Sequence, residues 1–333
     1  MRLLYAIQGT GNGHISRAED IIPILNEYGK LDIFVSGAQA DIKLSYPLKY
    51  KSRGLSFFFG KSGGIDFLKT FKQNSSKQVY REIKSFPVEK YDLIINDFEP
   101  ISAWAARKRN VPCVSLSHQS ALLSAKVPQP KHFDPVGEWI LKNYAPANAA
   151  VSFHFAQFDK NMYTPVIRSA IRNAKPENGE HYTVYLPAYD DRKLVPLLAK
   201  IPHTRWHIFS KHAKKPYHIG KLSVYPVNKD EFVASMISSK GVFCGAGFET
   251  PAEALFLGKK LLVVPMKKQY EQYYNAEALR EIGVPVIKNV KKKRLDKITE
   301  WIESGKPLEI NYPDTTKQAV EQALKLGGLS GIV

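Results

Sequence analysis

The sequence has few cysteines and no long hydrophobic run. Of its 333 residues only Cys113 and Cys244 are cysteines, and each lies in a short apolar segment. Two distant thiols in apolar surroundings indicate buried free cysteines in a reducing compartment, not a disulfide framework. No apolar stretch approaches the roughly 18 residues of a membrane span, and the apolar run after Arg2 ends too early for a signal peptide. We therefore expect a cytoplasmic protein without a transmembrane helix.

The sequence also has fewer acidic residues than basic ones. The chain has 48 Lys and Arg residues against 31 Asp and Glu residues, which gives a net charge of +17 and a pI near 9.6. Such an excess attracts polyanions, including nucleic acid, anionic lipid head groups and phosphorylated substrates. Residues 54–71 interleave phenylalanine with lysine, so they form either a core strand with an amphipathic helix or an acceptor loop that touches lipid.

Short β-rich runs alternate with amphipathic segments along the chain, which is the pattern of parallel sheets with crossover helices. Polar breakers interrupt this alternation between residues 163 and 179, and it then restarts. We therefore predict an α/β fold of two Rossmann-like domains, residues 1–163 and 164–314. A helix and tail at residues 315–333 are expected to cross back to the first domain.

A dinucleotide fingerprint does not fit the first glycine-rich loop. The G-x-G-x-x-G pattern would need glycine at position 14 or 16, where the sequence has His14 and Ser16. The acidic residue expected after the second strand is also missing. These departures disfavour a nicotinamide-dependent dehydrogenase.

A second glycine-rich segment, residues 245–255, leads from a predicted strand into a predicted helix. The next strand is followed by another helix, whose start is rich in polar residues. Glycines at such places let backbone N–H groups approach an anion at the positive end of a helix. Two successive helix N-termini beside polar side chains suit a nucleoside diphosphate and its ribose.

Residues 245–276 resemble the donor-binding region of GT-B glycosyltransferases, and most of all the MurG-like branch of lipid-linked N-acetylglucosaminyltransferases and diacylglycerol glycosyltransferases. The loop 9–14 is similar to the first glycine loop of that branch, with Asn12 in place of a usual glycine. Residues 116–119 resemble its acceptor-side histidine motif. The resemblance implies two domains that face a cleft, with a nucleotide-sugar in the second domain and an acceptor facing the first.

The resemblance also implies roles for individual residues. The donor is expected to contact both glycine segments, at Gly11, Asn12, Gly13, Gly245, Ala246, Gly247, Phe248, Glu249 and Thr250. Gln272 and Asn275 would contact the sugar or diphosphate, and His118 and Gln119 would face the acceptor. A UDP-sugar is expected as substrate, with no cofactor. We find no DxD metal motif, so helix dipoles and basic groups would stabilise the leaving nucleotide.

Glu253 has two interpretations. The resemblance implies that it accepts hydrogen bonds from the ribose hydroxyls. Thr250, Pro251 and Glu253 also have the spacing of a capping box, in which Thr250 caps the helix and Glu253 reaches back to it. The glycines on one side and the polar residues on the other favour ribose binding.

Three residues are candidates for a catalytic base. His14 follows the glycine loop, and histidine can remove a proton from an acceptor hydroxyl. Asp97 and Glu99 follow a buried strand end, where parallel sheets place groups that face ligands. The alternative for these two carboxylates is that they cap the helix that begins near Pro100.

The predicted reaction is glycosyl transfer, with inversion implied by the resemblance alone. A nucleotide-sugar 2-epimerase shares the architecture and is the nearest enzymatic alternative. The net charge of +17 motivates a third hypothesis, a non-catalytic binder of nucleotide or nucleic acid. Of the partners, we expect a nucleotide-sugar and not nucleic acid. A lipid-linked acceptor and an anionic membrane surface are further expectations, with the protein peripheral on the inner face.

Overall fold

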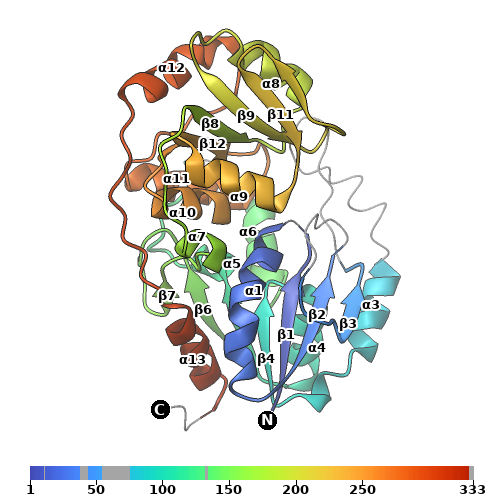
Figure 1. Cartoon of the computed structure of the whole chain (residues 1–333). Coiled ribbons are helices and arrows are strands. Elements are labelled where there is room, and N and C mark those ends of the chain that lie inside the picture. The colour runs from blue at the N-terminus through green and yellow to red at the C-terminus, as the bar shows by residue number, and fades with distance from the viewer. Residues whose placement is uncertain (11, 38–43, 55–75, 132–133, 330–333) are drawn as a thin grey trace.

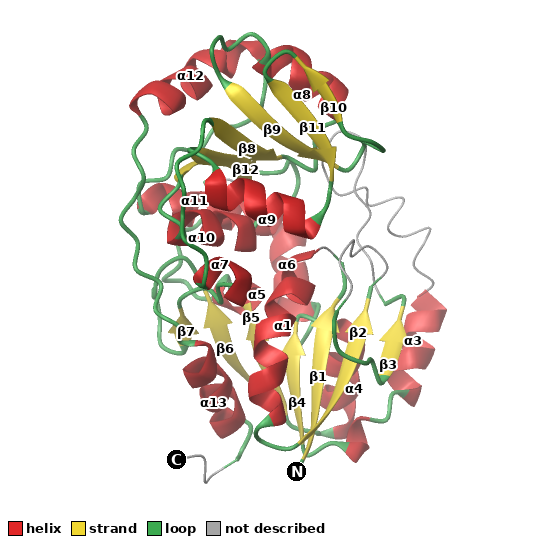
Figure 2. Ribbon diagram, in the orientation of Figure 1, coloured by secondary structure: helices red, strands yellow, loops and turns green. Residues whose placement is uncertain are grey.

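The computed structural model describes residues 1–10, 12–37, 44–54, 76–131 and 134–329. The described elements form two α/β domains, one above the other in Figure 1, each built around its own sheet. Helices cover both faces of each sheet (Figure 2). The predicted pair of Rossmann-like domains is confirmed. The first sheet spans residues 2–163 and the second begins at His181, on either side of the expected boundary.

The N-terminal domain has a fully parallel sheet with the strand order β3-β2-β1-β4-β5-β6-β7 in the described residues. Its strands are β1 (Arg2–Gln8), β2 (Lys30–Ser36), β3 (Tyr50–Ser52), β4 (Leu93–Asp97), β5 (Cys113–Ser117), β6 (Ala149–Phe153) and β7 (Met162–Tyr163). The strand β1 pairs with β2 and β4, so that Leu3 lies between Leu31 and Leu93. The strand β4 is buried along its whole length, as expected for a parallel sheet covered on both faces.

The helices of this domain follow the strands in the usual crossover order. They are α1 (Asn12–Asn26), α3 (Ser76–Ser85), the 3₁₀ turn η1 (Val88–Lys90), α4 (Pro100–Arg109), α5 (His118–Ala121) and α6 (Pro135–Asn143). The helix α1 buries Ile15, Ala18, Ile22 and Leu25, the helical spacing seen in the sequence.

The C-terminal domain has a second sheet, with the order β10-β11-β9-β8-β12-β13 in the described residues. Its strands are β8 (His181–Tyr185), β9 (Arg205–Ser210), β10 (Tyr217–Ile219), β11 (Leu222–Pro226), β12 (Gly241–Gly245) and β13 (Lys260–Val264). All pairs are parallel except β10 with β11. Its helices are α7 (Ser169–Arg172), α8 (Asp191–Leu198), α9 (Lys229–Ser238), α10 (Glu249–Phe256), α11 (Tyr270–Glu281), the 3₁₀ turn η2 (Lys292–Arg294) and α12 (Leu295–Ser304).

The last helix, α13 (Thr316–Leu326), returns to the N-terminal domain, as the sequence predicts (Figure 1). It packs against α1, β5 and β6. Its buried face consists of Ala319, Val320, Ala323 and Leu324. On the way, the Tyr312 hydroxyl donates a hydrogen bond to the carbonyl of Phe155. The chain therefore links the two domains twice, before β8 and after α12.

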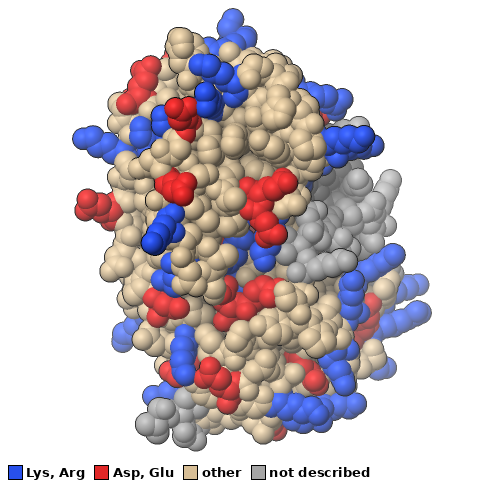
Figure 3. Space-filling model, viewed as in Figure 1, with Lys and Arg blue, Asp and Glu red and all other residues tan. Residues whose placement is uncertain are grey.

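The distribution of surface charge and the length of the apolar helices concern two expectations, the binding of polyanions and the lack of a transmembrane helix. On the face seen in Figure 3, the Lys and Arg side chains are spread over both domains and do not gather in one patch. None of the helices within the described ranges is long and apolar enough to cross a membrane. The phenylalanine- and lysine-rich residues 54–71, with their two interpretations, lie outside the described residues from residue 55 onward.

The burial of α13 generates a stability prediction. We expect Leu324→Ala to lower the free energy of unfolding by roughly 2–5 kcal/mol, because it leaves a cavity at a fully buried position. Chemical denaturation followed by circular dichroism measures this change. Lys325→Ala, at the exposed neighbouring position, is the matched control and should change stability little. Equal unfolding midpoints for the two variants would contradict the packing of α13.

Candidate functional site

A cavity of about 600 Å³ lies between the two domains and receives residues from both. From the N-terminal domain come the loop after β1 and the start of α1, including His14. The C-terminal domain contributes the segment after β12, the start of α9 and the start of α11. In open parallel sheets, ligands bind at the carboxyl ends of the strands, and both sheets present those ends here.

Most of the predicted donor-binding residues line this cavity. They are Asn12, Gly13, Gly245, Gly247, Phe248, Glu249, Thr250, Glu253 and Gln272. Gly11 lies outside the described residues. The other two predicted residues, Ala246 and Asn275, are fully buried behind the cavity wall, where the Asn275 amide donates a hydrogen bond to the Ala246 carbonyl. These two residues position the glycine segment and do not face the cavity.

His14 is held by a buried carboxylate. Its Nδ1 lies 2.8 Å from Asp97, and the Asp97 carboxylate is also contacted by Arg17, whose Nη2 is 2.7 and 2.8 Å from the two oxygens. His14 stands in the first turn of α1, Arg17 one turn later, and Asp97 at the end of β4. Neutral His14 with its proton on Nδ1 donates to Asp97, which leaves the lone pair of Nε2 for another partner.

Burial and charge act in opposite directions on the pKa of His14. Burial alone would lower it, but the Asp97 carboxylate raises the pKa, so the net shift is upward. Burial would raise the pKa of Asp97, yet Arg17 and then His14 lower it, so this carboxylate stays charged. Arg17 also opposes the upward shift on His14. The imidazole is therefore a stronger base than a free histidine, with a partner that remains ionised.

Arg17 joins this pair to the other domain. Its Nη1 donates to Glu249 of α10 at 2.6 Å, and the Arg17 side chain is only 1% exposed. Gly13 lets this contact form, because a Cβ there would collide with the Glu249 carboxylate. Arg17 was not among the site residues expected from the sequence. The signal that could have revealed it is a charged residue between Ile15 and Ala18, on the apolar side of a predicted helix.

Glu99, predicted as a candidate base, is a helix cap. Its carboxylate accepts hydrogen bonds from the backbone N–H groups of Ile101 and Ser102 at the start of α4, and from the hydroxyls of Ser36 and Ser102. The residue is fully buried and does not line the cavity. The structure therefore gives Glu99 the capping role that the sequence left as its alternative. Asp97 does not cap α4, whose N-cap is Glu99, and it contacts His14.

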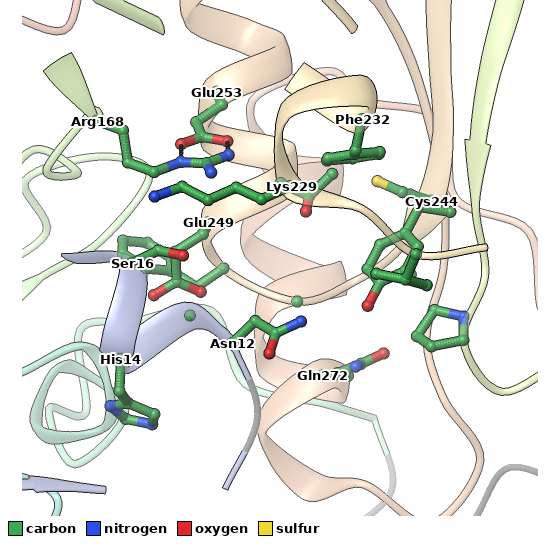
Figure 4. A pocket seen from close by; sticks show the side chains of 18 of the residues that line it. Asn12, His14, Ser16, Arg168, Lys229, Phe232, Cys244, Glu249, Glu253 and Gln272 are labelled. Atoms are coloured by element: carbon green, nitrogen blue, oxygen red, sulfur yellow. Dashed lines mark hydrogen bonds and ion pairs between the residues drawn. The ribbon is translucent and has the colours of Figure 1, made fainter. Parts of the chain in front are cut away.

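Glu253 does not form a capping box. The helix α10 begins at Glu249 with Phe248 as its N-cap, so Thr250 lies inside the helix and the capping interpretation is wrong. Instead both Glu253 oxygens are paired with the guanidinium of Arg168 (Figure 4). Burial raises the pKa of Glu253, and Arg168 opposes this shift. Glu253 still borders the cavity, as ribose binding requires.

The two predicted acceptor-side residues have different surroundings. His118 is buried, its ring stacks on Phe248 at 3.8 Å, and its nitrogens pair with the Phe153 carbonyl and with Asn275. This side chain connects the domains and does not reach the cavity, so its expected acceptor role is corrected. Gln119 does line the cavity, and its amide nitrogen lies 3.4 Å from His14 Nε2.

Two cationic side chains at the cavity were also missed by the sequence analysis. Arg168, just before α7, and Lys229, the first residue of α9, both line it. In Figure 4, Lys229 extends across the cavity toward the side where Arg168 lies. Lys229 forms no ion pair with the residues that the structure describes. Among those residues there is also no cluster of three His, Cys, Asp or Glu side chains that could hold a metal ion.

One family model matches most of the chain. The model described as glycosyl transferase family 1 matches residues 1–304. No curated protein matches the chain. Three solved structures with a similar fold are a UDP-glucosyltransferase from Polygonum tinctorium capable of glucosylating indoxyl, MurG from Acinetobacter baumannii, and LpCGTa in complex with UDP.

The similarity to these three structures shows the fold. The Polygonum enzyme is 14% identical, with a TM-score of 0.60 over 99% of each chain. MurG is 14% identical, with a TM-score of 0.58 over 97% of this chain and 99% of its own. LpCGTa is 13% identical, with a TM-score of 0.57 over 98% of this chain and 94% of its own. The GT-B fold implied by the sequence is therefore confirmed.

The contact between Asp97 and His14 generates a pH prediction. Asp97→Asn removes the charge that raises the pKa of His14, so that pKa should fall. NMR titration of the His14 ring protons measures the shift, and His14→Gln assigns the signal. The acid limb of the turnover profile should move to lower pH with it, because the neutral imidazole persists to lower pH. An unchanged His14 pKa would contradict the pairing.

Proposed function

The chain belongs to glycosyl transferase family 1, and on this premise we propose that it transfers a sugar from a UDP-sugar to an acceptor hydroxyl, with inversion and without a metal ion. It is a glycosyltransferase with a GT-B fold, and its family supports glycosyl transfer in preference to a 2-epimerase or a non-catalytic binder. One observation carries the proposal. His14, held by Asp97, lines the same cavity as the glycine segment that leads into α10.

The proposed chemistry begins with His14 as general base. As the acceptor oxygen forms its bond to the anomeric carbon, Nε2 takes the hydroxyl proton. The bond between that carbon and the diphosphate oxygen breaks, and the nucleoside diphosphate leaves with the electron pair. Attack on the face opposite the leaving group inverts the anomeric carbon. Asp97 stabilises the imidazolium that results, as a buried carboxylate does in other histidine-based catalysts.

The diphosphate charge would be balanced by the protein's own groups. Arg168 and Lys229 are the cationic side chains that line the cavity. The N-terminus of α10 also opens at the cavity, and helix N-termini favour anions. Four carboxylates border the same space, namely Asp230, Glu249, Glu253 and Glu271. The diphosphate is therefore expected beside Arg168 and Lys229, away from Glu271.

We propose that the protein recognises its donor through the uracil nucleotide. Two of the similar structures are a UDP-glucosyltransferase and LpCGTa in complex with UDP, which supports UDP for this chain. Apolar and aromatic side chains of the C-terminal domain, Tyr185, Pro187, Val227 and Phe232, line the part of the cavity contributed by that domain. They suit one face of a base, while Glu253 suits the ribose.

Several finer expectations from the sequence remain proposals. These are membership of the MurG-like branch, a lipid-linked acceptor, and a cytoplasmic protein bound peripherally to an anionic membrane. The resemblance of residues 245–276 supports the first two, and the net charge of +17 supports the third.

The general base can be tested by His14→Ala. We expect turnover at saturating UDP-sugar to fall by about 10²–10⁴, because a positioned base contributes that much. The affinity for UDP should stay within a few-fold, since the C-terminal domain supplies most of the donor contacts. UDP release and calorimetry with UDP measure the two quantities. His212→Ala, an exposed histidine outside the cavity, is the control. Equal turnover in both variants would remove His14 from the mechanism.

The ribose role of Glu253 can be tested by Glu253→Gln. Loss of a charge-assisted acceptor should weaken UDP binding roughly 10- to 100-fold, since such hydrogen bonds contribute about 1.5–3 kcal/mol. The melting temperature should also fall, because Arg168 loses its charged partner. Calorimetry well below the melting point separates the two effects. Glu281→Gln, exposed at the end of α11, is the control. Full UDP affinity in a folded Glu253→Gln variant would contradict ribose binding.

A further inference from the structure

Another cavity, of about 540 Å³, is lined by residues of the N-terminal domain alone. They come from α4, β5, α5, α6, β6 and the turns beside these elements. The cavity extends from Gln119, after β5, to Cys113 and Ala149, the first residues of β5 and β6. Parallel strands point their carboxyl ends at the cleft between the domains, so their first residues lie at the opposite end of the sheet. This cavity therefore runs along the sheet, away from the donor site.

The floor of this cavity is polar because β5 alternates. Val114 and Leu116 are buried in the core that α13 covers. Successive side chains of a strand point to opposite faces, so Ser115 and Ser117 lie on the other face of the sheet. Both line the cavity together with Ser120 of α5. A parallel sheet covered on both faces normally carries apolar side chains on both, so three serines here do not serve core packing. We call this cavity the serine groove.

The serine hydroxyls use their protons within the cluster. The Ser120 hydroxyl donates to the Ser117 carbonyl at 2.9 Å, and the Ser115 hydroxyl donates to the Ser120 hydroxyl oxygen at 3.2 Å. The hydroxyl oxygens of Ser115 and Ser117 are 3.1 Å apart, close enough for Ser117 to donate to Ser115. Each hydroxyl oxygen has two lone pairs, so the cluster can still accept hydrogen bonds from the O–H groups of a ligand.

A second acceptor at the groove is buried and has no partner. Gln119 is only 6% exposed, and its Oε1 forms no hydrogen bond with the residues that the structure describes. Its Nε2 is occupied, since it donates to Glu271 at 3.2 Å. A buried amide oxygen is rarely left without a donor. An O–H group in the groove would supply that donor, as it would for the serines.

The charges of the groove favour an anionic group at its far end. Its charged lining residues are Arg107 and Lys142, and none of the lining residues is a carboxylate. Lys142 is paired with Glu138 at 2.6 Å, whereas the Arg107 guanidinium lies over the Trp104 ring and forms no ion pair with the described part of the chain. Arg107 stands in the last turn of α4, away from the cleft. A guanidinium can bind a phosphate through two N–H groups at once.

We propose that the serine groove binds a phosphorylated polyol, such as a sugar phosphate, at a site separate from the donor site. The hydroxyls of the polyol donate to the serine oxygens and to Gln119, and its phosphate pairs with Arg107. A neutral sugar lacks the phosphate contact, and inorganic phosphate lacks the polyol hydroxyls, so both should bind more weakly. The inference concerns binding in the N-terminal domain and does not depend on the proposed reaction.

Binding to the full-length protein without donor tests the groove. We expect glucose 6-phosphate to bind more tightly than glucose or inorganic phosphate, measured by saturation-transfer NMR and calorimetry. Arg107→Gln should weaken this binding roughly 10- to 100-fold, the effect of losing a charge-assisted pair. Lys108→Gln removes the same charge from the next residue of α4, which is exposed and outside the groove, and should leave binding unchanged. UDP affinity, unchanged in both variants, reports that the fold and the donor site are intact.

The serine floor is tested by Ser115→Ala. This variant should bind glucose 6-phosphate more weakly while its affinity for inorganic phosphate stays the same, because only the polyol uses the hydroxyl cluster. Glycerol 3-phosphate and vesicles of phosphatidylglycerol carry the same chemistry in a soluble and a lipid-borne form. Binding of either one that Arg107→Gln weakens supports the proposal and identifies the source.

Three results would overturn the inference. One is that none of these phosphorylated polyols binds, and another is that Arg107→Gln and Lys108→Gln bind glucose 6-phosphate equally. The third is transfer of a sugar onto glucose 6-phosphate when a UDP-sugar is added, because the compound would then occupy the acceptor position and not a separate site. If no UDP-sugar turns over with any acceptor while glucose 6-phosphate binds as expected, the proposed function fails and the groove stands.

Discussion

The buried guanidinium of Arg17 is the contact on which the site depends. It belongs to α1, yet its two carboxylate partners, Asp97 and Glu249, come from different domains. A buried arginine without partners is strongly destabilising, so both carboxylates are needed to keep this charge between the domains. The same guanidinium contacts Asp97, which holds His14, and Glu249 of the other domain. The position of the His14 base therefore depends on the contact between the two domains.

This arrangement also sets the strength of the base. Asp97 raises the pKa of His14, but Arg17 shares the Asp97 charge and acts in the opposite direction on the imidazole. Without Arg17, the Asp97 carboxylate would raise the pKa of His14 further. Arg17 lowers the pKa of His14 and so favours the neutral imidazole, while Asp97 keeps the net shift upward. The glycosyl transfer proposed here needs that neutral form.

The longer helices and strands were predictable from the sequence because their apolar residues recur at the spacing of a helix or a buried strand. The alternation of strands and helices in both domains and the returning helix α13 agree with the sequence pattern. The short strand β7 and the antiparallel β10 were not expected, since a few residues carry no period. Likewise, local motifs located the glycine segments, but Arg168 and Lys229 reach the site through contacts between distant parts of the chain. Glu99 and His118 were expected at the site from their positions in the sequence, but both are buried and contact other residues. A position in a motif does not reveal what a buried side chain contacts.

The central claim is that a nucleoside diphosphate binds in the cavity that His14 lines. The most direct test is the pKa of His14, measured by NMR titration with and without saturating UDP. A diphosphate in this cavity stabilises the imidazolium, so UDP should raise that pKa, and by reciprocity UDP should bind more tightly as His14 becomes protonated. A His14 pKa that does not change when UDP saturates the protein would contradict the account.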